Sequence, residues 1–550
     1  MLAAAWLLAI GALAAWLRTP TTLLRQQLKT LQFWSLEITL LLLLSLGGLI
    51  LRDVCRVLSR RDAWRLAILA AAAMALTVLL PPRTNRIYYD EQIYQSIGQN
   101  LADLKLAQMC NDGVVEYGRL QCWSGEYNKQ PYAYPHLLSV LYRAFGVSAS
   151  TAFAFNAVVM ALTVCGVYLL VVVLFVDRTA ALFAGLIGML MPQQLLWSAT
   201  AAVEPSASLA SVAALLCAAS FCASKRTVSL AGTGVATVYA MQFRPESFLV
   251  VPVVGLILWR CVTRDELGRA RLWAVGLLSF ALVAVHLGHM VAVRNEGWGT
   301  NDARLSFGYV LSNLKVNGAF YLADERFPVL FTLLAAAGLA GRRWLAERLV
   351  FGVYFLLFFG IYLLFYAGSY NYGADVRYSV MTFPPLAVLG GLGVSAVVAW
   401  LERRTPGLRA TGLAAAAIVF QFLWYTPVVR ATTEEAWAAR ADVRFAESLV
   451  PEVRGNSYVL TQNPGMFHGW GVNAGQMSLI VTNPMHLHFL ATRYERVYLH
   501  WNFWCNVQDP VQQGFCKSAL DGKPVELVRE YRERGQRFAL YRFVMPPRQD

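Results

Sequence analysis

Asp90 and Glu91 are adjacent acidic residues in a position suited to chemistry, since they follow a long apolar run that ends at Pro81-Pro82. A carboxylate at a lipid–water boundary lies beside a low-dielectric wall, which raises its basicity, and beside water that admits a substrate. The pair therefore predicts a general base. Alternatively, the two carboxylates cap and charge the first turn of a surface helix.

Arg244 and Arg377 are candidate binding residues, because each is an isolated arginine at the end of an apolar segment. A guanidinium holds a phosphate through two parallel hydrogen bonds. Lys129 would add a point charge. The alternatives are internal ion pairs, Arg244 with Glu246 and Arg377 with Asp375, or arginines that extend to the membrane surface.

His286 and His289 lie three residues apart and so share one helix face. Together with Asp90, Glu91 or Glu204 they would complete a site for a divalent metal ion. Alternatively, they are hydrogen-bonded packing residues. We expect no other cofactor.

The composition is that of a polytopic membrane protein. Hydrophobic residues make up 57% and charged residues 15% of the 550 positions, whereas about 25% of the residues of a soluble protein are charged. The formal net charge is +14, but the basic residues occur in short clusters between apolar runs, as in cytoplasmic loops. The charge therefore indicates orientation in a membrane and not nucleic-acid binding. Compact loops and a high Ala, Leu and Arg content favour a bacterial inner (plasma) membrane.

About thirteen apolar segments predict a mainly α-helical fold with that number of membrane spans. They lie at about 2–17, 35–51, 66–82, 151–176, 180–198, 206–223, 228–243, 246–259, 273–293, 327–341, 349–367, 380–400 and 410–428. The first two, with the basic linker between them, form a hairpin that is interfacial or partly re-entrant. Short basic loops alternate with loops that carry acids and isolated arginines, so the candidate residues are all expected on the extracytoplasmic face.

The chain divides into an N-terminal membrane extension (1–63), a transmembrane domain (64–428) with a long outer loop (83–149), and a small extracytoplasmic α/β domain (429–550). In the last part we expect a helix from the capping box Thr432–Glu435 to about Leu449, strands at Ser457–Thr461, Arg496–His500 and Arg537–Val544, and a charged helix at Pro524–Arg534. The glycine-rich stretch Gln462–Gly475 lacks phosphate-binding spacing and a following helix signal, and is interpreted as a loop near the membrane that touches the acceptor.

Four cysteines predict two disulfides in an oxidising compartment. Cys110 and Cys122 lie in the outer loop, and Cys505 and Cys516 lie in the C-terminal domain, each pair at loop spacing. The other five are expected to stay reduced or to lie within spans: Cys55, Cys261, Cys165, Cys217 and Cys222.

The order of these features resembles the GT-C superfamily, which comprises polytopic glycosyltransferases that use polyprenyl-phosphate sugars. The likeness is greatest to the branch of protein O-mannosyltransferases and lipid A aminoarabinose transferases. The motifs that carry it are Asp90-Glu91 after an early span, the Lys129–His136 cluster, Glu204-Pro205, and Arg377-Tyr378 before a proline-rich span. The resemblance covers roughly 64–428, and Glu204 stands where relatives often have Asp.

The resemblance implies transfer of a sugar from a polyprenyl-phosphate donor to a protein, lipid or glycan acceptor on the extracytoplasmic face. Asp90 would deprotonate the acceptor hydroxyl, with Glu91 orienting the donor or the base, and a single displacement would invert the anomeric carbon. The residues expected to bind donor phosphate or substrate are Lys129, Glu204, Arg244, Arg377 and Tyr378.

Two other classes remain open on the sequence. A transporter or flippase of a lipid-linked or anionic solute would carry ionisable residues at mid-membrane depth and inverted repeats, whereas here the ionisable residues cluster at one face. A polysaccharide polymerase or ligase would be expected to carry its large catalytic loop late in the chain.

Overall fold

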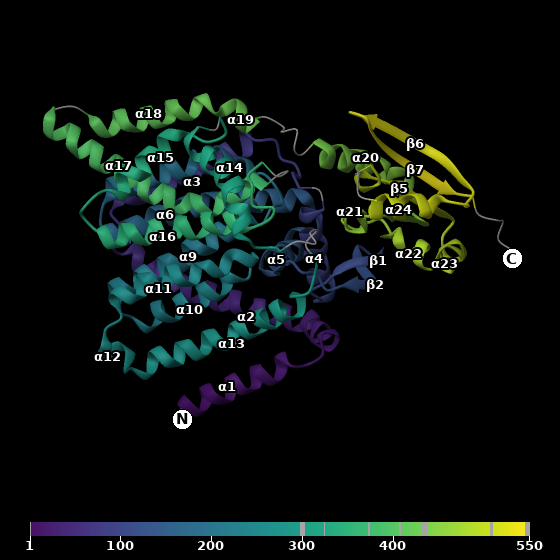
Figure 1. The fold of residues 1–550 in the computed structure, drawn as a ribbon, viewed down its shortest axis with the longest axis horizontal. Coiled ribbons are helices and arrows are strands. Elements are labelled where there is room, and N and C mark those ends of the chain that lie inside the picture. Colours follow the sequence, from purple (N-terminus) through teal and green to yellow (C-terminus); the bar gives the residue numbers. More distant parts are fainter. Residues whose placement is uncertain are drawn as a thin grey trace. The chain divides into compact units, whose positions relative to one another are not determined.

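The structure, a computed structural model, describes residues 2–87, 89–297, 303–323, 325–371, 375–405, 409–430, 437–506 and 510–544 (Figure 1). The predicted capping box Thr432–Glu435 and the side chain of Asp375 lie outside the described residues. The chain forms two compact units. Unit 1 comprises Met1–Arg83, Lys129–Ala133 and Phe153–Ala431, and unit 2 comprises Thr84–Asn128, Tyr134–Ala152 and Thr432–Asp550.

Unit 1 is built mainly from helices. Its helices are α1 (Leu2–Leu17), α2 (Thr21–Cys55), α3 (Arg60–Leu79), α6 (Ala149–Phe175), α7 (Arg178–Met189), α8 (Pro192–Ser198), α9 (Glu204–Ser224), α10 (Thr227–Met241), η1 (Pro245–Leu249), α11 (Val250–Cys261), α12 (Arg264–Leu267), α13 (Ala270–Val293), η2 (Phe307–Tyr309), α14 (Val310–Leu322), α15 (Val329–Leu339), α16 (Leu345–Leu364), η3 (Asp375–Thr382), α17 (Phe383–Arg404), α18 (Ala410–Trp424) and α19 (Thr426–Arg430). The predicted mainly α-helical class is confirmed.

Among the described residues, seven helices are long and apolar enough to cross a membrane, or eight if the pair α7 and α8, bent by 60°, is one broken span. Four further apolar helices have only 10–17 residues: α1, α10, α15 and α18. The expected count of about thirteen spans is therefore not confirmed. The predicted span 246–259, for example, is the 12-residue α11 behind a 3-10 turn, and at 1.5 Å per residue such a helix falls short of a bilayer core of about 30 Å.

The predicted basic linker between the first two apolar segments is mostly helix. The 35-residue α2 begins at Thr21 and takes in Arg25, which donates to the Ala292 carbonyl from Nε at 3.1 Å and Nη2 at 2.9 Å and pairs with Glu296. These partners at the end of α13 offset the desolvation of a charged side chain, so the helix continues where a loop was expected. Helices α2 and α13 run side by side (Figure 1).

Small residues bring the unit 1 helices α15 and α17 into backbone contact. A Cβ added at Gly338 would lie 1.8 Å from the Leu389 carbonyl oxygen, and one at Gly393 would lie 2.0 Å from the Leu334 carbonyl oxygen. Close approach through small residues is the usual way in which helices pack where lipid removes the hydrophobic drive between them.

Unit 2 is built around a seven-stranded sheet of order β2-β1-β4-β3-β5-β7-β6. Its strands are β1 (Met109–Glu116), β2 (Arg119–Glu126), β3 (Ser457–Thr461), β4 (Ala474–Gln476), β5 (Arg496–Trp501), β6 (Val525–Glu533) and β7 (Gln536–Phe543). Its helices are α4 (Asp90–Leu104), α5 (Ala133–Phe145), α20 (Trp437–Val453), α21 (Pro464–His468), α22 (Ser478–Thr482), α23 (Met485–Arg493), η5 (Phe503–Cys505) and α24 (Pro510–Leu520). Strand β3 pairs in parallel with β4 and β5, and the other pairs are antiparallel.

The division into units differs from the expected one because the outer loop belongs to the sheet. Strand β1 pairs with β4 through Asp112 opposite Gly475 and Gly113 opposite Ala474. The Asp112 carboxylate also accepts a hydrogen bond from the Tyr458 hydroxyl in β3. These contacts join the 83–149 loop to the segment predicted as a separate domain, 429–550.

The prediction of a charged helix at Pro524–Arg534 is wrong, because Val525–Glu533 is strand β6. Arg534 and Gly535 both have left-handed φ angles, 48° and 77°, and form the two-residue hairpin turn that matches the twist of paired strands. Cross-strand ion pairs such as Arg542 with Glu526 at 2.6 Å then satisfy the charges that suggested an exposed helix. Tyr117-Gly118 makes the same kind of turn between β1 and β2.

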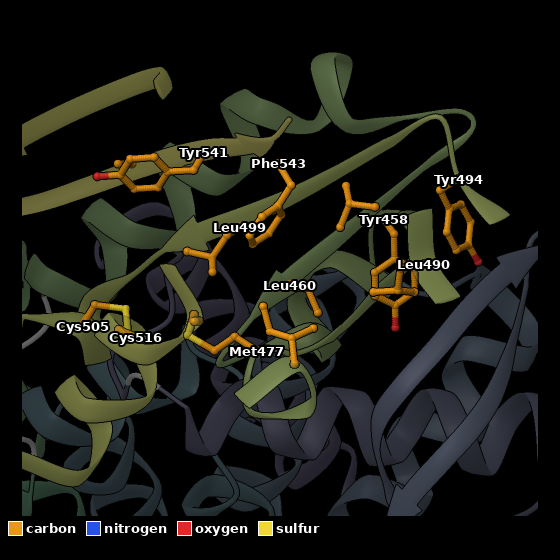
Figure 2. Packing of buried hydrophobic residues seen from close by; sticks show 14 of the residues in the cluster. Tyr458, Leu460, Met477, Leu490, Tyr494, Leu499, Cys505, Cys516, Tyr541 and Phe543 are labelled. Carbon is orange, nitrogen blue, oxygen red and sulfur yellow. A yellow bond between two sulfur atoms is a disulfide. The ribbon is translucent and has the colours of Figure 1, made fainter. Parts of the chain in front are cut away.

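The three predicted strands appear as β3, β5 and β7, and one face of the sheet packs an apolar core (Figure 2). Tyr458, Leu460 and Leu499 from the central strands point into it beside Met477, directly before α22, and Leu490 of α23 (Figure 2). These five side chains are almost fully buried. The core packs against β3 and β5, and Tyr458 of β3 also donates the hydrogen bond to Asp112 of β1.

Three disulfides are present among the described cysteines. Cys110 joins Cys122 across the β1–β2 hairpin, and Cys505 joins Cys516 beside the core of Figure 2, as the sequence predicts. The third, Cys222 with Cys261, was not predicted. It links the ends of α9 and α11, which pack on each other, so two cysteines that the sequence assigns to a span and to a reducing loop become neighbours. Cys55, Cys165 and Cys217 are free thiols.

Candidate active site

Four charged side chains meet in unit 1: Glu204, Arg244, Glu246 and Arg377. Arg244 donates hydrogen bonds to the Glu204 and Glu246 carboxylates. Arg377 Nε lies 3.2 Å from Glu204 Oε1, the oxygen that Arg244 also contacts. Glu204 therefore bridges the two arginines, and we call the four residues the arginine cluster.

Prolines explain why these residues lie at helix ends. Pro205 follows Glu204 in the first turn of α9, and Pro245 opens η1 directly after Arg244. Because proline has no N–H and a fixed φ near −65°, it favours the first turn of a helix. The Glu204 carboxylate thus lies at the N-terminus of α9, where the helix dipole stabilises negative charge.

Two stacked tyrosines border the arginine cluster. The Tyr362 and Tyr378 rings lie face to face with centroids 4.3 Å apart. The guanidinium carbons of Arg244 and Arg377 lie 5.1 Å and 5.2 Å from the Tyr378 centroid, within the range of cation–π attraction. The Tyr362 hydroxyl donates to Glu246. The rings hold both guanidiniums in place from one side.

The arginine cluster is buried and balanced in charge. The Glu204 side chain is 1% exposed, and the side chains of the other three members of the cluster are each 10% exposed. Buried ions persist when they are paired and hydrogen-bonded, and here two positive charges face two negative ones. A guanidinium carries five N–H donors, and the carboxylates fix the orientation of both guanidiniums.

Lys129 is anchored close to two other candidate residues of unit 1. Its Nζ donates to the Gly297 carbonyl, and a backbone hydrogen bond joins it to His289. Four residues further along, Ala133 N–H donates to the Gln242 carbonyl at 3.1 Å, two residues before Arg244. The short unit 1 segment 129–133 is thus fixed between α13 and the end of α10.

The two histidines pack on each other in α13. The rings of His286 and His289 are stacked with centroids 5.8 Å apart, and the Tyr132 ring lies edge-on to His289 at 5.5 Å. Within the described parts of the chain, no three His, Cys, Asp or Glu side chains gather where they could hold a metal ion. His286 and His289 by themselves would supply two metal ligands. Their stacked rings fit the alternative that they are packing residues better. The metal site stays a prediction.

Asp90 and Glu91 open α4 in unit 2 and have different surroundings. Glu91 is fully buried, and its Oε1 accepts from the backbone N–H groups of Arg86 at 2.7 Å and Ile87 at 2.9 Å. It closes the turn before the helix, as the capping alternative predicts. Asp90, the first helical residue, is only partly buried, so of the two it is the one that a substrate can reach.

Tyr89, directly before Asp90, has a strained backbone. Its φ is +80°, which a residue with a bulky side chain rarely adopts, and such strain tends to cluster at functional sites. The strain is held by a hydrogen bond from its N–H to Gln92 Oε1 at 2.9 Å and by an edge-to-face contact with Trp504. Burial, with the negative charges of Glu126 and Asp90, raises the Tyr89 pKa to about 12.

The structure thus brings together four of the predicted substrate-binding residues, Glu204, Arg244, Arg377 and Tyr378. The ion-pair alternative for Arg244 is present as well, since Glu246 joins the same group. The sequence analysis did not identify Tyr362 as a site residue. A tyrosine in an apolar segment does not indicate a functional site until the partner of its hydroxyl is known. The strain at Tyr89 was also missed, although a residue just before a helix N-terminus is a place where such strain occurs.

Solved structures of similar fold include two of ArnT from Cupriavidus metallidurans. The crystal structure bound to undecaprenyl phosphate matches with a TM-score of 0.55 and 14% sequence identity over 87% of this chain and 97% of that one. The apo crystal structure matches with a TM-score of 0.54 and 14% identity over 88% and 98%. The arabinofuranosyltransferase AftD from Mycobacteria gives a TM-score of 0.49 at 15% identity, over 88% of this chain and 40% of that one.

At the level of sequence, residues 129–289 match the model of the family described as dolichyl-phosphate-mannose-protein mannosyltransferase. A comparison with curated proteins finds no significant match. The matched residues contain Lys129, Glu204, Arg244 and both histidines of α13. The resemblance expected from the sequence is therefore supported in two ways: residues 129–289 are similar to a family of protein mannosyltransferases, and the chain has an ArnT-like fold.

Proposed function

We propose that this chain is an integral-membrane glycosyltransferase that moves one sugar from a polyprenyl-phosphate donor to an acceptor hydroxyl on the extracytoplasmic face of a bacterial inner membrane. The single observation that carries the proposal is the arginine cluster, in which Glu204 bridges Arg244 and Arg377. The ArnT-like fold supports it, because the ArnT crystal structure holds undecaprenyl phosphate.

The chemistry explains why two arginines serve this site. When the bond between the sugar C1 and the phosphate oxygen breaks, its electron pair leaves with the phosphate, which changes from a diester with one negative charge to a monoester with up to two. Fixed positive charge that meets the additional charge stabilises the transition state more than the ground state. Arg244 and Arg377 are already oriented by carboxylates and by Tyr378, so little reorganisation accompanies the reaction.

The acceptor must lose a proton as its oxygen attacks C1. Asp90 is the proposed base, since it is partly exposed, while Glu91 is occupied by two backbone N–H groups and holds the turn that presents Asp90. One displacement at C1, with the acceptor oxygen arriving as the phosphate leaves, inverts the anomeric configuration. Lys129 is proposed to add positive charge for the donor phosphate.

The role of Asp90 is tested by transfer with purified protein in lipid nanodiscs, a polyprenyl-phosphate sugar and crude membrane acceptors, with free polyprenyl phosphate as the readout. Asp90→Asn keeps the size of the side chain and removes the base, so the rate should fall about 10²–10⁴-fold. Glu116→Gln, which changes an exposed carboxylate at the end of β1, should keep the rate. An Asp90→Asn enzyme as fast as the unchanged protein would refute the assignment of the base.

The role of the arginine cluster is tested separately by donor binding. Arg377→Lys keeps the charge but loses the planar fork, so donor affinity should fall about tenfold, as expected for one charged hydrogen bond. Asp90→Asn should bind the donor as tightly as the unchanged protein. Equal donor affinity in Arg377→Lys and the unchanged protein would place the phosphate elsewhere.

A further inference from the structure

Unit 2 contains a pocket that none of the assignments above uses. Its walls come from Asn85 and α4, from the turn at 147–149, from α20 and from the segment around α21. The lining residues are Asn85, Gln92, Gln95, Gln99, Val147, Ser148, Ala149, Val443, Gly465, Met466, Gly469 and Trp470. The cavity volume is about 60 Å³, enough for several water molecules and so for the hydroxyl groups along one edge of a small polar ring.

Amide side chains form one wall of the pocket. Gln92, Gln95 and Gln99 are spaced by three and four residues, which places them on one face of α4, and Asn85 adds a fourth amide. Each amide offers one acceptor oxygen and two N–H donors. Some of this capacity is used within the protein, since Gln95 Nε2 donates to the Glu91 carbonyl and Gln99 Nε2 to the His468 carbonyl.

Two of these amides are buried with an unmet hydrogen-bonding group. Gln92 is 3% exposed; its Oε1 accepts from Tyr89 N–H, and its Nε2 has no hydrogen-bond partner within the described structure. Asn85 is 7% exposed, and its Oδ1 likewise has none among the residues described. A buried polar group without a partner destabilises the folded protein. Both residues line the pocket, and a polar ligand that reached these two atoms would satisfy them.

Apolar side chains form another part of the lining. Trp470 is half-buried and lies edge-to-face with Phe467 at 5.8 Å, and Met466 and Val443 also line the pocket. None of the described lining residues is ionisable, which disfavours a phosphate or a metal ion as ligand. A lining that combines an aromatic ring with amides suits a neutral molecule with one C–H face and one hydroxyl edge, as a sugar ring has.

We propose that this pocket binds a neutral sugar ring of the acceptor, so that the acceptor is a glycan or glycolipid. The inference rests on the proposed function and specifies its substrate class. Its link to the chemistry is α4 itself: Asp90 is the first residue of the helix and Gln92 lies two residues later, about 3 Å along the axis. A glycan bound by the amides of α4 would therefore be positioned by the same helix that carries the proposed base.

Gly469 provides a clean way to block the pocket. A Cβ built there would meet only the backbone oxygens of Met466 at 3.5 Å and Gly465 at 3.6 Å, both ordinary contacts, and its φ of −61° suits any residue. Gly469→Ala should therefore fold and bind normally, whereas the longer chain of Gly469→Leu would occupy the pocket. Gln95→Leu removes one amide whose hydrogen bond in the protein is to the Glu91 carbonyl of its own helix.

The experiment measures binding of neutral methyl glycosides and short oligosaccharides of hexoses, pentoses and N-acetylhexosamines to the full chain in nanodiscs, without donor, by saturation-transfer NMR. We expect one sugar class to bind, with affinity reduced about tenfold by Gln95→Leu and abolished by Gly469→Leu but not by Gly469→Ala. In transfer assays Gly469→Leu should raise the acceptor KM and leave kcat close to that of Gly469→Ala.

The outcomes separate the pocket from the proposed function. If no neutral sugar binds, or if Gly469→Leu binds sugars and keeps its acceptor KM, the pocket proposal is overturned even where transfer occurs. If sugars bind in the way described, and also bind to Asp90→Asn, while no donor supports transfer, the pocket stands and the proposed reaction fails.

Discussion

His468 should make the stability of unit 2 depend on pH between about 4 and 7. This residue ends α21 beside the pocket, and it is 1% exposed. Its Nε2–H donates to the Ala474 carbonyl at 2.9 Å, a bond that the protonated ring makes as well, so burial is what favours the neutral ring. Burial lowers the His468 pKa from 6.5 to about 4. Between about pH 4 and 6.5, His468 is therefore protonated in the unfolded chain and neutral in the folded chain. The contribution of neutral His468 to the free energy of unfolding is fully present above pH 6.5 and is lost as the pH falls through the folded-state pKa.

The size of the effect follows from these two pKa values. At pH 5 the unfolded histidine is almost fully protonated and the folded one is mostly neutral, which lowers the stability by about 2 kcal/mol relative to pH 7.5. That difference corresponds to roughly a thirtyfold increase in the opening equilibrium. The loss would level off below pH 4, where both states carry the proton.

Hydrogen–deuterium exchange of the full chain gives the opening free energy of α21 and β4 at each pH after correction for intrinsic exchange. His468→Gln keeps an N–H donor for the Ala474 carbonyl and cannot be protonated, so the pH-dependent part should disappear. His488→Gln, at an exposed position, should behave as the unchanged protein. The same pH dependence in His468→Gln as in the unchanged protein would refute the argument.

Two further predictions concern unit 1. Gly338→Ala should lower the melting temperature in detergent, since its Cβ would lie 1.8 Å from the Leu389 carbonyl oxygen and overpacking costs about 1–3 kcal/mol; Gly360→Ala, with nothing within 4 Å, should not, and equal melting temperatures would contradict the close packing. Cys222 and Cys261 should resist maleimide labelling in unfolded, unreduced protein and react after reduction; labelling before reduction would restore the expectation of free thiols.

Much of the chemistry was readable from the sequence because charges in an apolar chain are few. Glu204, Arg244 and Arg377 stand alone beside apolar segments, and an ionisable residue at the end of a span needs a partner, so their meeting could be anticipated. Which partner each of these residues takes could not be predicted from the sequence. The sequence offered Asp375 for Arg377, an alternative that stays untested because the Asp375 side chain lies outside the described residues, and it did not indicate the contact of Arg377 with Glu204 from another helix.

The fold was least predictable where distant segments pair. Strand β1 joins β4 from the far end of the chain, and no local pattern in either strand specifies that partner. The prediction of a helix at Pro524–Arg534 was wrong for a related reason. The charged residues of this segment suit a helix by themselves, and the segment forms a strand because it pairs with β7. The amide face of α4 was visible as the spacing of Gln92, Gln95 and Gln99, but its meaning depends on the wall that α21 supplies.

The most direct test of the central proposal is release of free polyprenyl phosphate by the purified full chain in lipid, offered a panel of polyprenyl-phosphate sugars together with crude membrane acceptors. We predict release from one donor, accompanied by appearance of the sugar on an acceptor, and loss of both in Asp90→Asn. Release from no donor, combined with movement of an intact lipid-linked sugar across a proteoliposome membrane, would contradict the glycosyltransferase and favour a transporter.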